Sequence, residues 1–133
     1  MLPLRYLRRW RIAGILLLGL VLAFALAPDI WPWDRHKGPH LVSDKVLHGF
    51  TFAFLALWYT GQYGRNLYVR LSIGLLAFGA LIELCQLMVG YRDAEWGDLL
   101  ADAVGILIGM TIALAGAGGW SLAIEKQLRR RHE

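Results

Sequence analysis

The sequence predicts an all-α integral membrane protein, built as a four-helix bundle with both termini on the cytoplasmic side. Three observations lead to this prediction. Of the 133 residues, 57% are hydrophobic and only 18% are charged, which suits a small membrane domain better than a soluble one. The apolar residues fall into four segments separated by polar stretches. The basic residues gather in parts of the chain that would share one side of a membrane.

The first predicted helix covers about residues 11–28 and follows four arginines within residues 5–11. Its uncharged run has 16 residues, slightly fewer than the ~20 that a spanning helix needs. A basic start, an apolar run and the Ala-Leu-Ala sequence at 25–27 also suit a cleaved signal peptide. Pro28 would follow the cut and hinder it, which favours a retained helix. Both alternatives stay open at this point.

Three further apolar segments predict helices at about residues 43–60, 69–89 and 98–117. Ser43 is a suitable N-cap, and Asp44 would face the positive end of the helix dipole. The Pro-rich stretch before them argues against a helix there. The basic tail at 120–133 is expected either to lie along the inner membrane surface or to be solvated and partly disordered. The whole chain, 1–133, is predicted to be one domain.

The topology follows from the positions of lysine and arginine. With both termini cytoplasmic, ten of the fourteen basic residues lie inside, as the positive-inside rule requires. The tryptophan and tyrosine residues also fall near the ends of the predicted helices, where membrane interfaces attract them. The sequence therefore predicts a multi-pass protein of the cytoplasmic membrane. The net charge of +4 is explained by the inside termini and does not indicate nucleic-acid binding.

Ionisable residues occur inside the apolar segments, where charge is costly and is a functional candidate by default. His48, Glu83 and Asp102 lie at similar depths in the outer third of their helices, from a rise of ~1.5 Å per residue. Helical spacing puts each on a polar or small-residue stripe. These stripes are Asp44 and His48; Gly79, Glu83, Gln86 and Gly90; and Asp98, Asp102, Gly105 and Gly109.

The glycines predict where two backbones approach closely. Gly79, Gly105 and Gly109 are expected to let the third and fourth helices pack tightly and to turn Glu83 toward Asp102. A polar pocket open to the outer surface would result, lined by Asp44, Lys45, His48, Glu83, Gln86, Arg92, Asp98 and Asp102. The alternative is that these groups only pair to hold the bundle together. The single cysteine, Cys85, excludes an internal disulfide and is expected to pack between helices.

The same residues carry a resemblance to the VanZ-like family of small bacterial membrane proteins. The family pattern has Asp-Lys-x-x-His at the start of one helix, which matches residues 44–48, and Glu-x-x-Gln near the end of the next, which matches residues 83–86. Arg, Asp, Asn and spaced glycines follow. Here these correspond to Arg92, Asp98, Gly105 and Gly109, but Asp102 stands where the pattern has Asn.

The resemblance implies a multi-pass protein of the bacterial cytoplasmic membrane with a role in the cell envelope. The family's founding member is associated with low-level resistance to the glycopeptide teicoplanin, so glycopeptide tolerance is among the implied roles. The carboxylate at Asp102 puts in doubt a ligand that needs a neutral amide there. The resemblance covers about residues 43–109 and names no reaction.

Two functional classes are therefore expected besides a purely structural bundle. In the first, the pocket binds a membrane lipid or a lipid-linked envelope precursor, with Lys45, His48 and Arg92 facing phosphate. In the second, an enzyme acts on such a molecule, with His48 and Glu83 as acid and base. A divalent cation such as magnesium, calcium or manganese is a candidate cofactor in either class. Its candidate ligands are His48, Glu83, Asp98 and Asp102.

Overall fold

Five α-helices make up most of the computed structural model, which describes residues 1–26, 44–89 and 96–133. They are α1 (Leu7–Leu26), α2 (Asp44–Thr60), α3 (Tyr68–Val89), α4 (Trp96–Ile112) and α5 (Trp120–Arg131). A 3-10 turn, η1 (Arg65–Leu67), precedes α3, and a π-helical turn, η2 (Ala113–Ala117), follows α4. These three ranges contain no strand, so the all-α class is confirmed for them. The first helix begins at Leu7, four residues earlier than predicted.

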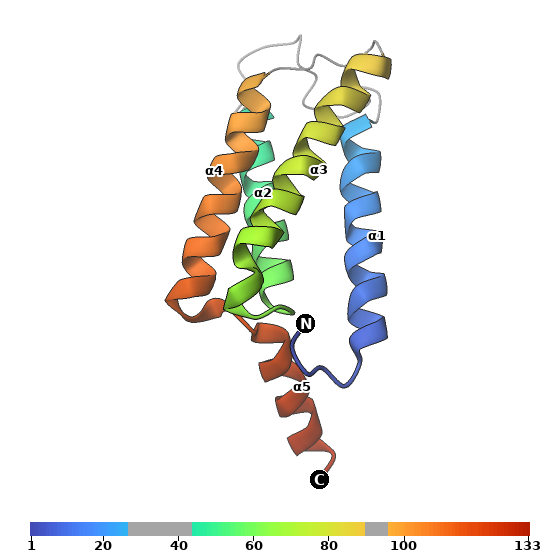
Figure 1. Ribbon diagram of the computed structural model, residues 1–133. Coiled ribbons are helices and arrows are strands. Elements are labelled where there is room, and N and C mark those ends of the chain that lie inside the picture. Colours follow the sequence, from blue (N-terminus) through green and yellow to red (C-terminus); the bar gives the residue numbers. More distant parts are fainter. Residues whose placement is uncertain (27–43, 90–95) are drawn as a thin grey trace.

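Helices α1 to α4 run alongside one another, and both chain termini lie at the same end of the molecule (Figure 1). Helix α2 lies against α3 and α4, α3 also lies against α4, and α1 lies mainly against α3. Helix α5 extends beyond the end that holds the termini (Figure 1). A four-helix bundle that spans a membrane stays a prediction.

Within the described residues, three helical segments are long and apolar enough to cross a membrane. They are Leu7–Leu26 with 20 residues, Arg65–Val89 with 25 and Trp96–Ala117 with 22. Few of their residues are buried inside the molecule: large apolar side chains such as Ile15 and Leu107 are exposed to 68% and 67%. An apolar surface of this extent on a soluble monomer would be unusual, whereas lipid would cover it favourably. Helix α2, with 17 residues, is shorter than these three.

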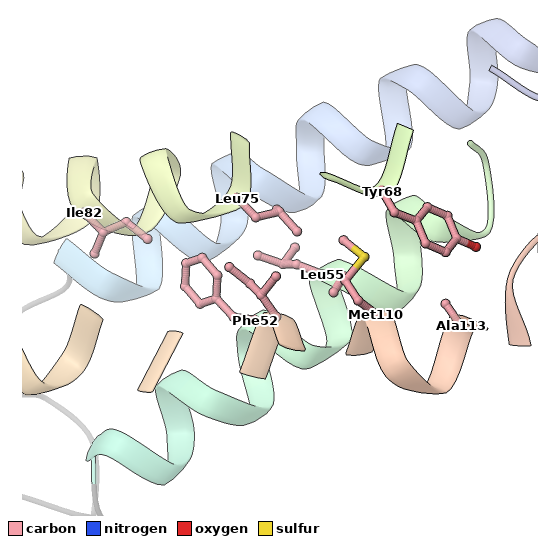
Figure 2. Close-up of a cluster of buried hydrophobic side chains, with 9 residues drawn as sticks. Phe52, Leu55, Tyr68, Leu75, Ile82, Met110 and Ala113 are labelled. Atoms are coloured by element: carbon pink, nitrogen blue, oxygen red, sulfur yellow. The ribbon is translucent and has the colours of Figure 1, made fainter. Parts of the chain in front are cut away.

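The apolar core lies between α2, α3 and α4 (Figure 2). Phe52, Leu55 and Ala56 of α2 are almost fully buried, so this helix lies in the middle of the assembly. Side chains of the other two helices surround them, including Leu75, Ile82, Ile106 and Met110, with Tyr68 and Ala113 at the end near the termini. The core thus runs along most of the length of α2, below the polar residues at its first turn.

The glycines of α4 contact α2, which corrects the predicted pairing of the third and fourth helices. A Cβ atom added to Gly105 would lie 2.2 Å from the carbonyl oxygen of Gly49. One added to Gly109 would lie 2.6 Å from the Ala56 Cβ atom and 2.7 Å from the Ala53 carbonyl oxygen. Helix α2 offers a matching row of small residues at i, i+4 and i+7, namely Gly49, Ala53 and Ala56. Small residues on both sides let the two backbones approach, and α4 therefore packs most closely on α2.

Helix α1 lies at the edge of the assembly, and two polar side chains hold it to α2 and α3. Of its residues only Gly14 is buried. The Tyr59 hydroxyl donates a hydrogen bond of 3.0 Å to the Gly14 carbonyl oxygen. Near the other end of α1, Nε2 of Gln86 donates to the Ala25 carbonyl oxygen at 3.0 Å. Ala25 belongs to the last turn of α1, whose carbonyl groups lack partners within the helix.

The basic tail forms a helix rather than a disordered segment. Gly116 and Gly119 have φ values of 138° and 72°, which favour glycine, and they redirect the chain between α4 and α5. Two side chains at the start of α5 then bond to the last turn of α2 and to the residue that follows it. Nε1 of Trp120 donates to the Leu57 carbonyl oxygen at 2.7 Å, and the Ser121 hydroxyl donates to the Gly61 carbonyl oxygen. Helix α5 is therefore fixed to the rest of the fold at its first turn.

Glu125 of α5 caps the start of α1. Its carboxylate accepts hydrogen bonds from the backbone N–H groups of Arg5 at 2.8 Å and Tyr6 at 3.1 Å, and from Nε1 of Trp10 at 2.7 Å. Helix α1 has no acidic residue in its own first turn, so this carboxylate supplies both a cap and a negative charge at the positive end of the dipole. Burial alone would raise the pKa of Glu125, but the hydrogen bonds from Arg5, Trp10 and Tyr6 lower it overall.

Replacing Glu125 by alanine should destabilise the fold by about 0.5 to 2 kcal/mol, the usual effect of losing an N-cap. The contribution should be complete above pH 4.5, the ordinary pKa of the group, because the folded pKa is lower. It should disappear as the pH falls through the folded value. Thermal unfolding of detergent-solubilised protein between pH 7 and pH 3 measures both effects. The control is Glu133→Ala, which removes an exposed pair with Arg129. An equal loss in the two variants would contradict the capping role.

Candidate functional site

Three helices bring histidine and carboxylate side chains together at the end of the molecule opposite the termini. His48 lies one turn into α2, Asp98 and Asp102 lie in the first two turns of α4, and Glu83 lies near the end of α3. Figure 1 shows that the start of α2, the end of α3 and the start of α4 share this end. We call these four residues the polar cluster. They come from the stripes on which the sequence analysis placed them.

The imidazole of His48 lies between two aspartates. Its Nδ1 atom lies 2.9 Å from Oδ1 of Asp102, a hydrogen bond in which Nδ1–H donates to the carboxylate. Its Nε2 atom lies 3.8 Å from Oδ2 of Asp98. Asp102 is fully buried, and the His48 side chain is 14% exposed. Such a pair fixes the orientation and the tautomer of the imidazole and directs Nε2 toward Asp98.

Glu83 completes a group of three residues with metal-ligand chemistry. One nitrogen of His48 and one carboxylate oxygen each of Glu83 and Asp98 all lie within 4.8 Å of one another. Both carboxylates are buried. The structure thus gathers three of the four predicted metal candidates around one point. Asp102, the fourth, instead bonds to the opposite side of the imidazole.

Gly79 provides the space that the Asp102 carboxylate occupies. A Cβ atom added to Gly79 would lie 2.6 Å from Oδ2 of Asp102 and 3.3 Å from Cζ of Phe52. The sequence predicted that this glycine allows close helix packing, and it does allow the Asp102 side chain of α4 to reach the backbone of α3. The ring of Phe52 on its other side belongs to the apolar core. Gly79 therefore lies where the polar cluster meets that core.

Gln86, predicted to line the pocket, has a structural contact. Its amide nitrogen donates to the Ala25 carbonyl oxygen and so ties α3 to α1. Its Oε1 atom is buried and accepts no hydrogen bond from the residues that the structure describes. The amide nitrogen thus holds two helices together. The amide oxygen lies one turn beyond Glu83 on the same face of α3 and is a further oxygen atom that is able to bind a cation.

The predicted cationic side of the pocket is only partly described. Lys45 is exposed, and its side chain crosses the start of α4, because a Cβ atom on Gly97 would lie 2.6 Å from its Cε atom. Arg92 and the side chain of Asp44 lie outside the described residues. Sequence analysis missed Gly49 and Gly97. The signal for Gly49 was its place in the row of small residues on α2, next to His48.

Comparisons with protein-family models, with curated proteins and with solved structures gave no match. The VanZ-like resemblance stays a prediction that rests on the motif residues. Chemically, the polar cluster offers an oriented imidazole and buried carboxylates that are able to bind cations, amines or hydroxyl groups, and to transfer protons.

Proposed function

We propose that this chain is a VanZ-like protein of the bacterial cytoplasmic membrane that binds the headgroup of a lipid or lipid-linked envelope molecule at the polar cluster. The observation that carries this proposal is the placement of His48 between Asp98 and Asp102, 2.9 Å from the latter, with Glu83 close by. Buried ionisable groups in apolar surroundings are costly and are kept where they have a function. The residues that carry the family resemblance supply this cluster.

The proposed orientation places the polar cluster toward the outer side of the membrane and the termini in the cytoplasm. The end that holds the termini carries the basic residues of the N-terminal segment and α5. The rings of Trp10, Trp58 and Trp120 form a group there, with centroids 5.5 to 5.9 Å apart. Positive charge and clustered tryptophan are typical of the inner membrane interface. A role in envelope homeostasis or glycopeptide tolerance would follow from what the site binds.

The ligand class follows from the chemistry of the cluster and its surroundings. Carboxylates accept hydrogen bonds from hydroxyl or amino groups of a headgroup, and the Lys45 ammonium group attracts phosphate. Exposed apolar side chains lie next to the cluster on the same helices, including Leu47 on α2 and Leu84 and Leu87 on α3. Acyl or polyprenyl chains would cover these side chains. An amphiphile suits such a site better than a free polar molecule.

An enzyme that acts on a lipid-linked substrate is the second candidate. The bond between His48 and Asp102 favours it, because an aspartate that orients an imidazole is a common feature of general acid and base catalysis. Glu83 would be the second proton-transferring group. Conversion of a bound lipid-linked molecule into a product of different mass would distinguish this candidate from binding alone.

The test is mass spectrometry of lipids that co-purify with the full chain in detergent, comparing the wild type with His48→Asn and Glu83→Gln. We expect a retained lipid near one per chain, reduced at least tenfold in both variants, while the thermal midpoint of Glu83→Gln stays close to the wild-type value. His132→Asn and Glu133→Gln, both exposed and far from the cluster, are the matched controls. Identical lipid profiles in all five proteins would favour a structural bundle without a ligand.

A further inference from the structure

We propose that His48, Glu83 and Asp98 form a binding site for one divalent first-row transition-metal ion, with Asp102 holding the imidazole in place. The part of this inference that explains how a phosphate headgroup is recognised rests on the proposed function. The binding of the metal itself does not, and it is measured separately below.

The geometry of the three side chains carries the proposal. Their ligand atoms lie within 4.8 Å of one another and come from three different helices, α2, α3 and α4. Metal to ligand distances of about 2.0 to 2.2 Å put the atoms of one coordination shell about 3 to 4.4 Å apart. Small side-chain rotations therefore suffice to form the shell. Because the three helices pack around a common core, the backbone need not move.

The bond between His48 and Asp102 is an independent observation that points to a metal. A metal-binding histidine generally donates its second ring N–H to a carboxylate or carbonyl, which fixes the tautomer and directs the lone pair of the other nitrogen at the ion. Here Nδ1–H donates to Asp102, so the lone pair of Nε2 points to the side of the ring where Asp98 lies. Asp102 is fully buried, and its Oδ2 atom accepts no hydrogen bond within the described ranges. Gly79 leaves room for it.

The ligand set selects the kind of ion. The two carboxylate ligands balance the charge of one divalent cation, so the ion offsets the cost of burying them in apolar surroundings, and the Asp102 carboxylate leaves the loaded site with one negative charge. Carboxylate oxygens alone would suit magnesium or calcium, whereas an imidazole nitrogen suits zinc or iron, and manganese accepts the carboxylate ligands of the same set. We therefore assign the site to Mn²⁺ or Zn²⁺ rather than to Mg²⁺ or Ca²⁺.

Three protein ligands leave at least one coordination position for another oxygen. A phosphate oxygen of a lipid headgroup would take this position. The ion would then account for how a site rich in carboxylates attracts an anionic group, since the carboxylates alone would repel it. Lys45, at the start of α2, would add a second positive charge close to the same phosphate.

The experiment uses the purified full chain in detergent, stripped with a chelator and freed of lipid. Mn²⁺ binding is followed by the loss of the electron paramagnetic resonance signal of the free ion, and Zn²⁺ binding by elemental analysis after gel filtration. We expect about one ion per wild-type chain, and binding at least 30-fold weaker in His48→Gln, Glu83→Gln and Asp98→Asn. Asp102→Asn should weaken binding by roughly 10- to 100-fold, because the amide still orients the imidazole but no longer raises its basicity as the carboxylate does. His132→Gln, matched in chemistry but remote and exposed, should bind like the wild type.

A wild-type chain that binds neither ion below ~1 mM would overturn the inference, as would equal binding by His48→Gln and His132→Gln. A variant that fails to fold is replaced by a measurement on the wild type alone, whose thermal midpoint should rise with Mn²⁺ or Zn²⁺ and not with equal Mg²⁺. An equal response to all three would also overturn it. Metal binding without lipid retention would refute only the proposed function. Lipid retention that survives the chelator would refute only the role of the metal ion in binding the lipid headgroup.

Discussion

Replacing Gly105 by alanine should destabilise the fold by about 1 to 3 kcal/mol, and replacing it by leucine should cost more. The added Cβ atom would lie 2.2 Å from the carbonyl oxygen, 2.9 Å from the carbonyl carbon and 3.0 Å from the Cα atom of Gly49. These are backbone atoms within a helix, so no side chain is able to rotate away. Relief requires α2 and α4 to separate, which also opens the core around Phe52 and Ile106. The measurement is the thermal midpoint of the detergent-solubilised chain.

The matched control for this change is Gly74→Ala. Gly74 also lies inside a long helix, α3, but a Cβ atom there meets no atom of the described residues within 4 Å. Alanine should leave the midpoint unchanged or raise it slightly, because it is the better helix former. Gly109→Ala should behave like Gly105→Ala, since its Cβ atom would collide with Ala53 and Ala56. Equal midpoints for Gly74→Ala and Gly105→Ala would show that α2 and α4 are not held by close backbone contact.

These glycines also show what the sequence was able to predict about helix packing. Apolar runs with polar ends predicted where helices occur, because length and hydropathy depend on local sequence alone. The glycine spacing predicted that one face of α4 approaches another backbone. It did not identify the partner, because a small face fits any other small face. The row formed by Gly49, Ala53 and Ala56 was the missing half of the signal, and it lies among phenylalanines that mask it.

Contacts to backbone atoms were the least predictable part of the structure. Glu125 belongs to the basic tail, which is expected either to lie along the membrane surface or to be solvated, but it caps α1 through the N–H groups of Arg5 and Tyr6. Gln86 is predicted to line the pocket, but its amide nitrogen bonds to the carbonyl group of Ala25. Every residue except proline carries the same backbone donor and acceptor, so the sequence does not indicate which of them a distant side chain contacts.

The candidate site was more predictable because its residues are unusual in their surroundings. A histidine and carboxylates within apolar helices are rare enough to be noticed, and helical spacing gave their depth and face. The predicted common depth was that of His48, Glu83 and Asp102, whereas the structure brings the ligand atoms of His48, Glu83 and Asp98 together. The separate position of Asp102, on the Nδ1 side of the imidazole, depends on how α4 is rotated against α2. That rotation follows from the close contact of Gly105 with Gly49, which the spacing of one helix does not reveal.

Replacing Asp102 by leucine should destabilise the fold by roughly 3 to 5 kcal/mol, the usual cost of breaking one partner of a buried pair. Leucine branches at the same carbon atom but accepts no hydrogen bond, so Nδ1–H of His48 would lose its partner. Asparagine, which the VanZ-like pattern has at this position, keeps a carbonyl oxygen that is able to accept from Nδ1–H. Asp102→Asn should therefore cost less than about 1.5 kcal/mol, the net value of an ordinary hydrogen bond.

Thermal unfolding of the two Asp102 variants, together with lipid retention, separates a structural role of the polar cluster from a binding role. Asparagine preserves the orientation of His48 but removes a negative charge that sits fully buried beside Gly79. A stable Asp102→Asn protein with reduced retention would mean that the charge serves the ligand. Full retention would mean that the hydrogen bond to His48 is the whole contribution of Asp102. Equal midpoints for the asparagine and leucine variants would contradict the buried pair itself, because only one of them is able to replace the bond at 2.9 Å.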